Sequence, residues 1–255
     1  MSTIKKAKKK INAAILIIGN EILSGRTQDL NVSFISNWLN INCGISILEV
    51  RIIPDIEKKI IFNVIDLSKK FKYVFTTGGI GPTHDDITSH SISKAFNAKY
   101  EFNNKAFSIL EKYYGKKNFN NARKKMAKMP AGSKLIYNPS SSAPGFKIRN
   151  VLCLPGVPSI LKSMMPNLKK YLTRGLLTYS KTIALVTVES RIASMLSKLQ
   201  RKYKKKIDIG SYPFFRLGNV GVSVVLRSTD KQVIKKCENE FVRLIKKNKI
   251  TIHST

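Results

Sequence analysis

Acidic residues are scarce in this sequence. Only 15 Asp and Glu stand against 46 Lys and Arg, which gives a formal net charge of +31 over 255 residues. A hydrophobic content of 43% excludes a disordered polyelectrolyte, so the charge belongs on the surface of a folded protein. Such a surface attracts polyanions without choosing among them. Lys, Asn and Ile are abundant together, as an AT-rich genome would produce, so the charge alone is no evidence for a nucleic-acid partner.

Cysteine and long apolar runs are also scarce. Cys43, Cys153 and Cys237 are far apart and form no C-x-x-C pair, which predicts reduced, buried thiols. The apolar run near the start is short and ends in Gly-Asn-Glu without a clear small-residue cleavage site, which argues against a signal peptide. Because no stretch approaches the length of a membrane span, we expect a soluble, cytoplasmic protein with no membrane partner.

The sequence offers no clear nucleic-acid recognition module. The segment GNVG at 218–221 has the spelling of a KH loop, but it precedes an apparent strand instead of lying between two helices. We interpret it as a turn and expect no specific nucleic-acid partner.

Apolar runs and helical spacing alternate over the first two thirds of the chain. Ala13–Ile18 is a continuous apolar run typical of a central parallel strand, and 45–53 and 73–77 predict two more strands. Helical patterns lie between them, and Asp55 is the expected N-cap of the second. Helical stretches are expected from 91 to about 129, then a strand at 151–154 and a helix from about 158.

The pattern restarts after about residue 175. Strands and helices there read β-α-β-β-α-β, a two-layer α+β arrangement with no obvious catalytic motif. The predicted organisation is a basic tail at 1–12, a three-layer α/β/α domain with a mostly parallel sheet at 13–175, and a small α+β domain at 176–255. Ligands of such parallel sheets bind beyond the carboxyl ends of the strands.

The stretch TTGGIGPTHDD, residues 76–86, follows one of these strands. Its glycines allow a tight turn and let backbone N–H groups approach an anion, with the helix expected near Thr88 adding its positive end. Taken alone, the segment is equally a structural turn, since it is neither a Walker A motif nor a dinucleotide fingerprint.

Asp85 and Asp86 close this stretch. Two carboxylates beside a phosphate-sized cradle could hold Mg²⁺ and activate one of its waters. The alternative is helix capping by Asp86 or Thr88. A transition-metal site built from His84, His90 and Asp86 is a further alternative, but no third histidine or cysteine has suitable spacing.

Two more loops carry polar residues. The loop after the first strand offers Glu21, Ser24, Arg26 and Asp29, of which Arg26 could pair with a phosphate or remain a solvated surface arginine. The loop NPSSSAPGF at 138–146 has consecutive hydroxyls suited to polar ligand atoms, although alone it reads as an ordinary surface loop.

Four motifs together resemble one family. GNEILSGRTQDLN, TTGGIGPTHDDIT, NPSSSAPGF and LPGVPS occur in the order and approximate spacing of the molybdopterin-binding (MoaB/Mog-like) domain. The version they resemble most is that of the CinA amino-terminal domain and the amino-terminal domain of eukaryotic FAD synthases. The resemblance covers about 13–172 and implies a three-layer α/β fold with its pocket at the strand ends.

The resemblance implies that Asp29 and Asp86 are acidic residues of the pocket, that Gly78, Gly79 and Gly81 form the anion cradle, and that Ser140–Ser142 belong to the ligand-binding loop. The full set of expected site residues combines these with the residues identified above from their chemistry. Asp29, Asp85 and Asp86 are the expected catalytic acids, with Asp85 and Asp86 as the ligands of Mg²⁺ or another divalent cation such as Co²⁺. The expected ligand-binding residues are Gly78, Gly79, Gly81, Thr83, His84, Glu21, Ser24, Asn138, Ser140, Ser141, Ser142, Pro155 and Gly156.

The function implied first is metal-dependent hydrolysis of the pyrophosphate bond of a dinucleotide-like ligand, ADP-ribose or FAD, by a protein that forms homo-oligomers. One alternative is a molybdopterin-binding protein or transferase of molybdenum cofactor biosynthesis. Another is a non-catalytic protein associated with polyanions or nucleic acid. The sequence ends at Thr255 without the nicotinamide-nucleotide deamidase domain of CinA proteins or the adenylyltransferase domain of FAD synthases, so those activities are not carried over.

Overall fold

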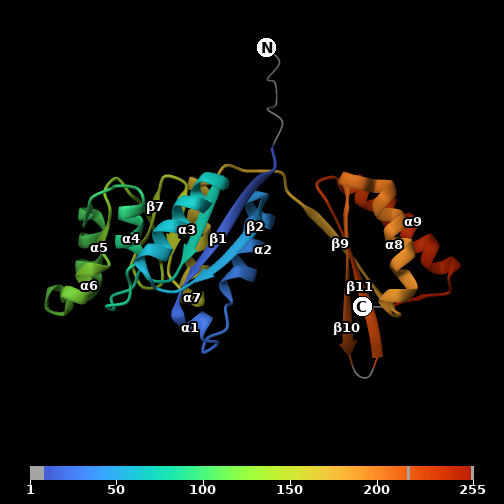
Figure 1. The fold of residues 1–255 in the computed structure, drawn as a ribbon, viewed down its shortest axis with the longest axis horizontal. Helices are drawn as coiled ribbons and strands as arrows, with labels where there is room; N and C mark the ends of the chain where they lie inside the picture. The colour runs from blue at the N-terminus through green and yellow to red at the C-terminus, as the bar shows by residue number, and fades with distance from the viewer. Residues whose placement is uncertain (1–8, 217–218, 254–255) are drawn as a thin grey trace, which may run out of the picture. The chain divides into compact units, whose positions relative to one another are not determined.

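The computed structural model describes residues 9–216 and 219–253. The chain divides into two compact units, Met1–Leu176 and Leu177–Thr255, and Figure 1 labels the elements of each. Most of the predicted basic tail lies outside the described residues, as does Gly218 of the GNVG segment. The first strand, β1 (Ile11–Ile18), takes in the last two residues that the tail was expected to hold.

The first unit is built on a six-stranded sheet with the order β2-β1-β3-β8-β7-β6. Strands β2 (Ile45–Ile53), β1, β3 (Tyr73–Thr77) and β8 (Val151–Leu154) are parallel. Strands β7 (Gly145–Ile148) and β6 (Lys134–Ile136) add an antiparallel edge. The predicted mostly parallel sheet is therefore confirmed.

Alternation along β1 sends buried side chains to both faces of this sheet. Ala14, Leu16 and Ile18 join a core under α3 (Glu57–Lys70) and α4 (Thr88–Ala95). Ala13, Ile15 and Ile17 join a second core under α2 (Asn31–Cys43) and α7 (Pro158–Met164). Both faces are covered, as the continuous apolar run of β1 requires, and the predicted three layers result.

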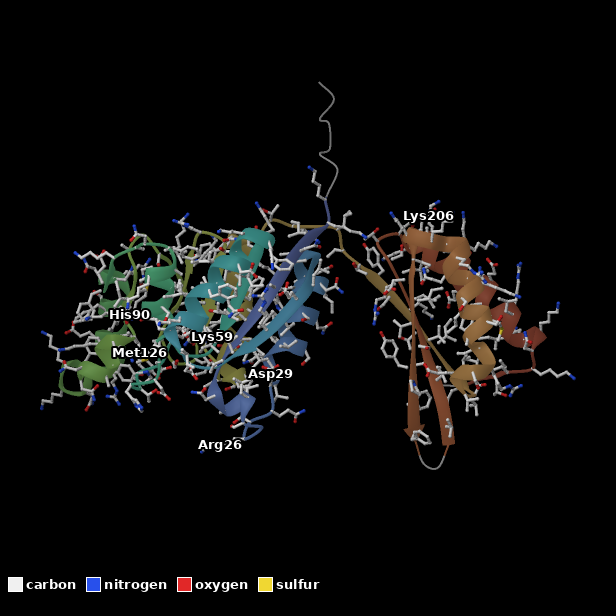
Figure 2. All side chains as sticks on the ribbon, viewed as in Figure 1. Arg26, Asp29, Lys59, His90, Met126 and Lys206 are labelled. Atoms are coloured by element: carbon white, nitrogen blue, oxygen red, sulfur yellow. The ribbon has the colours of Figure 1, made fainter. Side chains whose placement is uncertain are left out.

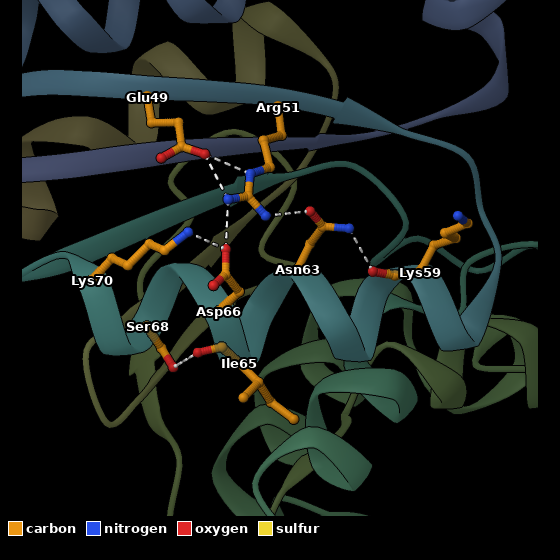
Figure 3. A network of polar contacts seen from close by, with 8 residues as sticks. All are labelled: Glu49, Arg51, Lys59, Asn63, Ile65, Asp66, Ser68 and Lys70. Carbon is orange, nitrogen blue, oxygen red and sulfur yellow. Dashed lines mark hydrogen bonds and ion pairs between the residues drawn. The ribbon is translucent and has the colours of Figure 1, made fainter.

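A polar network fastens the edge strand β2 to α3 (Figure 3). The guanidinium of Arg51 donates to Glu49 at 2.6 Å, to the Asn63 side chain at 2.8 Å and to Asp66 at 2.5 Å. Lys70 reaches the same Asp66 oxygen at 2.9 Å. The three acceptors bind the same planar guanidinium group, so the network fixes the position of β2 on the helix.

The region expected to be helical from 91 to about 129 is only partly so. Helices α5 (Asn104–Tyr114) and α6 (Asn121–Lys125) form there, with a single 3-10 turn, η1 (Lys116–Asn118), between them. Two three-residue strands, β4 (Tyr100–Phe102) and β5 (Lys128–Pro130), pair antiparallel on either side of them. The expected helical stretches are present, but the two short strands were not predicted, because three residues show no period that a sequence can reveal.

The second unit follows the predicted β-α-β-β-α-β order. Strands β9 (Tyr179–Val186), β10 (Asp208–Arg216), β11 (Asn219–Ser228) and β12 (Thr251–Ile252) form an antiparallel sheet in the order β10-β11-β9-β12. Helices α8 (Glu189–Tyr203) and α9 (Lys231–Lys247) cover one face through a separate core that includes Leu185, Val224 and Phe241. The sheet and the helices make two layers (Figure 1).

The three cysteines are free and buried, as predicted. Burial raises the pKa of Cys153 to about 12 and of Cys237 to about 11, which keeps both thiols protonated and unreactive. Within the described part of the chain, no helix combines the length and the apolar character that crossing a membrane requires.

Candidate functional site

The carboxyl ends of β1, β2, β3 and β8 meet at one edge of the first sheet. Past the end of β1, Gly19 N donates to Ile53 O at 3.2 Å, and past the end of β3, Gly78 N donates to Leu154 O at 3.1 Å. The loops that leave these strands therefore start side by side, as the parallel arrangement requires. Short helix α1 (Asn20–Leu23), which follows β1, lies at this edge (Figure 1).

The three glycines of the predicted anion cradle sit where a side chain would not fit. Gly78 and Gly79 have φ angles of 98° and 67°, and a Cβ would lie 2.1 Å from Ile18 O in the first case and 2.1 Å from Thr88 Oγ1 in the second. A Cβ on Gly81 would lie 2.7 Å from Asp86 Oδ2. The glycines thus permit the tight turn that the sequence predicted, and the binding of an anion by its N–H groups stays a prediction.

Asp86 folds back onto its own loop. Its Oδ2 accepts hydrogen bonds from the Thr83 N–H at 2.8 Å and from the Thr83 hydroxyl at 2.5 Å. The side chain of Lys125, from α6, donates to Thr83 O on the same turn. The alternative interpretation, capping of α4 by Asp86 or Thr88, is wrong, since Ile87 is the N-cap residue and no side chain caps that helix.

Asp55 is drawn into the same region. The expected capping of α3 by Asp55 is also wrong: the N-cap residue is Ile56, and Asp55 Oδ2 instead accepts the Asn20 N–H at 2.9 Å. Its other oxygen lies 3.6 Å from the position that a Cβ of Gly79 would take. Asp55 bonds to Asn20 and not to the first N–H groups of α3. The bond to Asn20 satisfies an N–H at the start of α1 that would otherwise lack an acceptor.

Four of the few acids gather around this point. Partial burial raises the pKa of Asp55, and the charges of Glu21, Asp85 and Asp86 raise it further. Contacts with Thr83 and with its own backbone amide lower the pKa of the exposed Asp85, helped by the charges of His84 and Lys125. We call Glu21, Asp55, Asp85 and Asp86 the acidic centre. In a chain of net charge +31, it is a local concentration of negative charge at the strand ends.

The acids form no ready-made metal cage. Among residues 9–216 and 219–253, no group of three or more His, Cys, Asp and Glu side chains is arranged to hold a metal ion. His90 Nδ1 lies 3.1 Å from Glu57, and its ring packs edge-on to Tyr100, while His84 is exposed on the loop. The two histidines and Asp86 thus serve different contacts, which disfavours the transition-metal alternative.

Asp29 holds the start of α2. Its two carboxylate oxygens accept the Asn31 N–H at 3.3 Å and the Val32 N–H at 2.9 Å. The buried side chain of Asn31 then donates to Gly156 O at 2.7 Å, in the loop after β8. A Cβ on Gly156 would lie 3.4 Å from Gly78 Cα, so this chain of contacts ties three of the four loops together.

The remaining polar residues of the first loop lie further out. Ser24 Oγ donates to Glu21 O at 3.2 Å, and Arg26 is exposed at the tip of the loop, where Figure 2 labels it beyond Asp29. Pro155 is half-buried between β8 and Gly156. Arg26 and Ser24 are therefore free to meet a ligand only from the rim of the site.

The serine loop is shaped by Asn138. This residue is 1% exposed; its amide nitrogen donates to Ser141 Oγ at 2.7 Å and to Ala143 O at 2.8 Å, and its oxygen accepts the N–H groups of Ser140 and Ser141 at 2.9 and 3.2 Å. Ser140 Oγ donates to Ser163 of α7 at 2.8 Å. Asn138 thus organises the loop, and Ser142, at a left-handed φ of 59°, is the strained point within it.

Three residues that the sequence did not single out for the site contribute to it: Asp55, Asn31 and Thr88. Thr88 is fully buried, and its hydroxyl has no hydrogen-bond partner within the described residues, although it lies against Gly79. The position of Asp55 directly after a predicted strand is a signal that could have identified it. Asn31 and Thr88 are the last residues of two of the motifs that carry the family resemblance, but their roles depend on contacts across the fold that the sequence does not show.

Comparisons with known proteins agree with this arrangement. Residues 14–174 match the family described as "Probable molybdopterin binding domain", and residues 177–253 match the one described as "FAD synthase, middle domain". Proteins of Archaeoglobus fulgidus and Sulfolobus acidocaldarius are each 32% identical, over 91% and 92% of this chain and 96% and 93% of their own. The crystal structure of "the protein CinA with unknown function" from Thermoplasma acidophilum is 31% identical, with a TM-score of 0.60, over 64% of this chain and 98% of its own.

The resemblance inferred from the four motifs is thereby confirmed. The second match also assigns a family to the second unit, for which the order of strands and helices alone gave none. The chain belongs to the molybdopterin-binding domain family, and its second unit is similar to the FAD synthase middle domain.

Proposed function

We propose that the first unit hydrolyses the pyrophosphate bond of a dinucleotide-like ligand, with ADP-ribose and FAD as the candidate substrates. The observation that carries this proposal is the meeting of Asp55, Asp85 and Asp86 with the close-packed glycine turn at the ends of β1, β2 and β3. The N–H groups of glycine turns donate hydrogen bonds to phosphate oxygens, and clustered carboxylates suit a divalent cation.

The acids fit Mg²⁺ or a similar divalent cation. Partial burial and then the like charges of neighbouring acids raise the pKa of Asp55, and a cation bound beside the carboxylates relieves that repulsion. Mg²⁺ is typically held by one or two carboxylates together with substrate phosphates, so a complete protein cage is not required. Asp85 and Asp86 would hold the ion, which would supply charge neutralisation and a more acidic bound water.

The protein groups have separable roles in this proposal. Backbone N–H groups of Gly79, Ile80 and Gly81 bind phosphate oxygens, since that of Gly78 is engaged by Leu154 O. They stabilise the charge that develops as water attacks phosphorus and the bridging P–O bond breaks. Thr83 fixes the Asp86 carboxylate, and Asp29 fixes α2, through which Asn31 positions the loop at Gly156. Ser140, Ser141 and Ser142 lie on the loop that would contact the remaining ligand.

The experiment is phosphorus NMR of the protein with Mg²⁺ or Co²⁺ and, separately, ADP-ribose and FAD. The proposal predicts two monophosphate products from each substrate cleaved, and none from the Asp86→Asn variant. Asn keeps an oxygen that can accept the Thr83 bonds, so the variant removes charge with little change to the loop. Intact substrate with both proteins would refute the proposal.

The second candidate is a molybdopterin-binding function in cofactor assembly, which the match of residues 14–174 favours. A pterin that carries a phosphate would use the same glycine turn. This candidate predicts binding of the pterin without dinucleotide cleavage, and equilibrium binding of a pterin phosphate measured by its fluorescence tests it. No change in pterin fluorescence over a full titration would exclude it.

A further inference from the structure

The second unit carries a concentration of positive charge of its own. Between 177 and 255, 17 Lys and Arg stand against 5 Asp and Glu. Helix α8 ends in a single 3-10 turn, η3 (Lys204–Lys206), that consists of three lysines. A hollow of about 710 Å³ lies there, lined by Lys202, Tyr203, Lys204, Lys205, Lys206, Val233 and Lys236. We call these residues the lysine hollow; Lys206 is labelled in Figure 2.

The backbone of the lysine turn is held from two sides. The Gln200 amide donates to Lys204 O at 3.1 Å and to Ile207 O at 2.9 Å, and its oxygen accepts the Ile209 N–H at 3.0 Å. Ser228, which is 6% exposed, donates to Lys206 O at 2.6 Å. Lys204 has a φ of 43°, a strained value for a residue with a side chain, and the surrounding bonds maintain it.

Most of the ammonium groups here are uncompensated. Within the described residues, Lys204, Lys205, Lys206 and Lys236 form no ion pair with a carboxylate, whereas Lys202 binds Glu240 at 2.8 Å. Four cations held close together repel one another, and a polyanion removes that repulsion. The positive charge of the hollow is thus not neutralised by the carboxylates of the described residues.

One wall of the hollow is less polar. Tyr203 donates its hydroxyl to Glu240 at 3.1 Å, and partial burial together with this bond raises its pKa to about 12. The phenol therefore stays neutral and adds no negative charge at neutral pH. With Val233, the ring offers an apolar surface beside the ammonium groups.

We propose that the lysine hollow binds the phosphate backbone of a single-stranded nucleic acid without reading its sequence. A strand is narrow enough to enter a concave site and place several phosphates against the lysines, while Tyr203 can contact a sugar or base. A bilayer is flat and would touch only the rim of a hollow. Lysines act as point charges that position a backbone, so no base preference follows.

The test is fluorescence anisotropy of labelled oligouridine and of a mixed-sequence RNA with the full chain, between about 50 and 200 mM salt. The variant Lys204→Gln, Lys205→Gln, Lys206→Gln is compared with a matched control, Lys246→Gln, Lys247→Gln, Lys249→Gln, which removes equal charge near the end of α9. The turn variant should reduce the slope of log affinity against log salt by about 2, and affinity by about 10- to 100-fold. The control should change both far less.

A variant that leaves the turn intact, Lys236→Gln, guards against misfolding and should reduce the slope by about 0.7. Equal losses in the turn variant and the matched control would mean that overall charge alone binds RNA, and the proposal would fall. It would also fall if the wild type binds neither RNA. The same holds if the turn variant loses binding only to vesicles of phosphatidylserine and phosphatidylcholine.

Discussion

Asp55 links the fold and the proposed chemistry at the scale of single residues. Its carboxylate fixes the start of α1 through Asn20, and it lies close enough to Glu21, Asp85 and Asp86 for their charges to raise its pKa. Groups whose pKa is shifted by several like charges at strand ends are common at functional sites. A site that gathers like charges costs stability, and stabilising it tends to cost function.

Replacing Asp55 with Asn should stabilise the protein at neutral pH by up to about 1 kcal/mol, since solvent screens these partly exposed charges. The raised pKa means that the folded state holds this proton more tightly than the unfolded state. The resulting stability is present at low pH and is lost as pH rises through the folded-state pKa. Urea unfolding at several pH values should show the gain at pH 7 and its disappearance below the usual pKa of an aspartate. A variant less stable than the wild type at pH 7 would contradict this reading.

Gly79→Ala should destabilise the first unit by about 2 to 4 kcal/mol, because alanine combines a left-handed backbone with a contact to the buried Thr88 side chain. Gly132→Ala is the matched control: its φ is 75°, but nothing lies within 4 Å of its Cβ position. That variant should lose only about 1 to 2 kcal/mol. Equal losses in chemical denaturation would show that packing at Gly79 does not matter.

At the scale of elements, predictability follows the strength of the local signal. Strands β2 and β3 were predicted at their observed limits, because each is rich in β-branched and aromatic residues and is followed directly by a proline or a glycine. Strands β4 and β5 were not predicted, since three residues are too few to show the alternation of a strand. Within the site, the glycine turn was readable from the sequence, whereas the bond from Asp55 to Asn20 spans 35 residues and depends on the finished fold.

The attachment of β2 to α3 gives a prediction at this scale. Arg51→Gln should cost about 1 to 2 kcal/mol, because three polar partners, Glu49, Asn63 and Asp66, lose a shared charged donor. Lys70→Gln should cost less than about 0.5 kcal/mol, since that ion pair is more exposed. Urea denaturation of both variants measures the difference, and a Lys70 variant as unstable as the Arg51 variant would contradict it.

At the scale of the whole molecule, the two units have separate cores. The two apolar clusters of the first unit and the single cluster of the second share no residue, and the division falls between Leu176 and Leu177. The boundary also separates the two family matches, at 14–174 and 177–253. The acidic centre and the lysine hollow lie in different units, so their activities should be separable.

A chain ending at Leu176 should therefore fold and keep the proposed phosphate chemistry, within about a factor of 10 of the full chain. It should lose the RNA binding assigned to the lysine hollow. Circular dichroism and turnover of ADP-ribose check the first point, and anisotropy checks the second. A folded fragment with no turnover, beside an active full chain, would assign part of the reaction to the second unit.

The most direct test of the acidic centre is ADP-ribose turnover by Asp55→Asn, followed by phosphorus NMR. The matched control is Asp230→Asn, which changes an aspartate that caps α9 in the second unit, where Asn caps equally well. We expect at least a 100-fold loss of turnover for Asp55→Asn, with the fold kept and a stability equal to or above that of the wild type, and wild-type turnover for Asp230→Asn. Wild-type turnover by Asp55→Asn would contradict the claim that this cluster of acids is the functional centre.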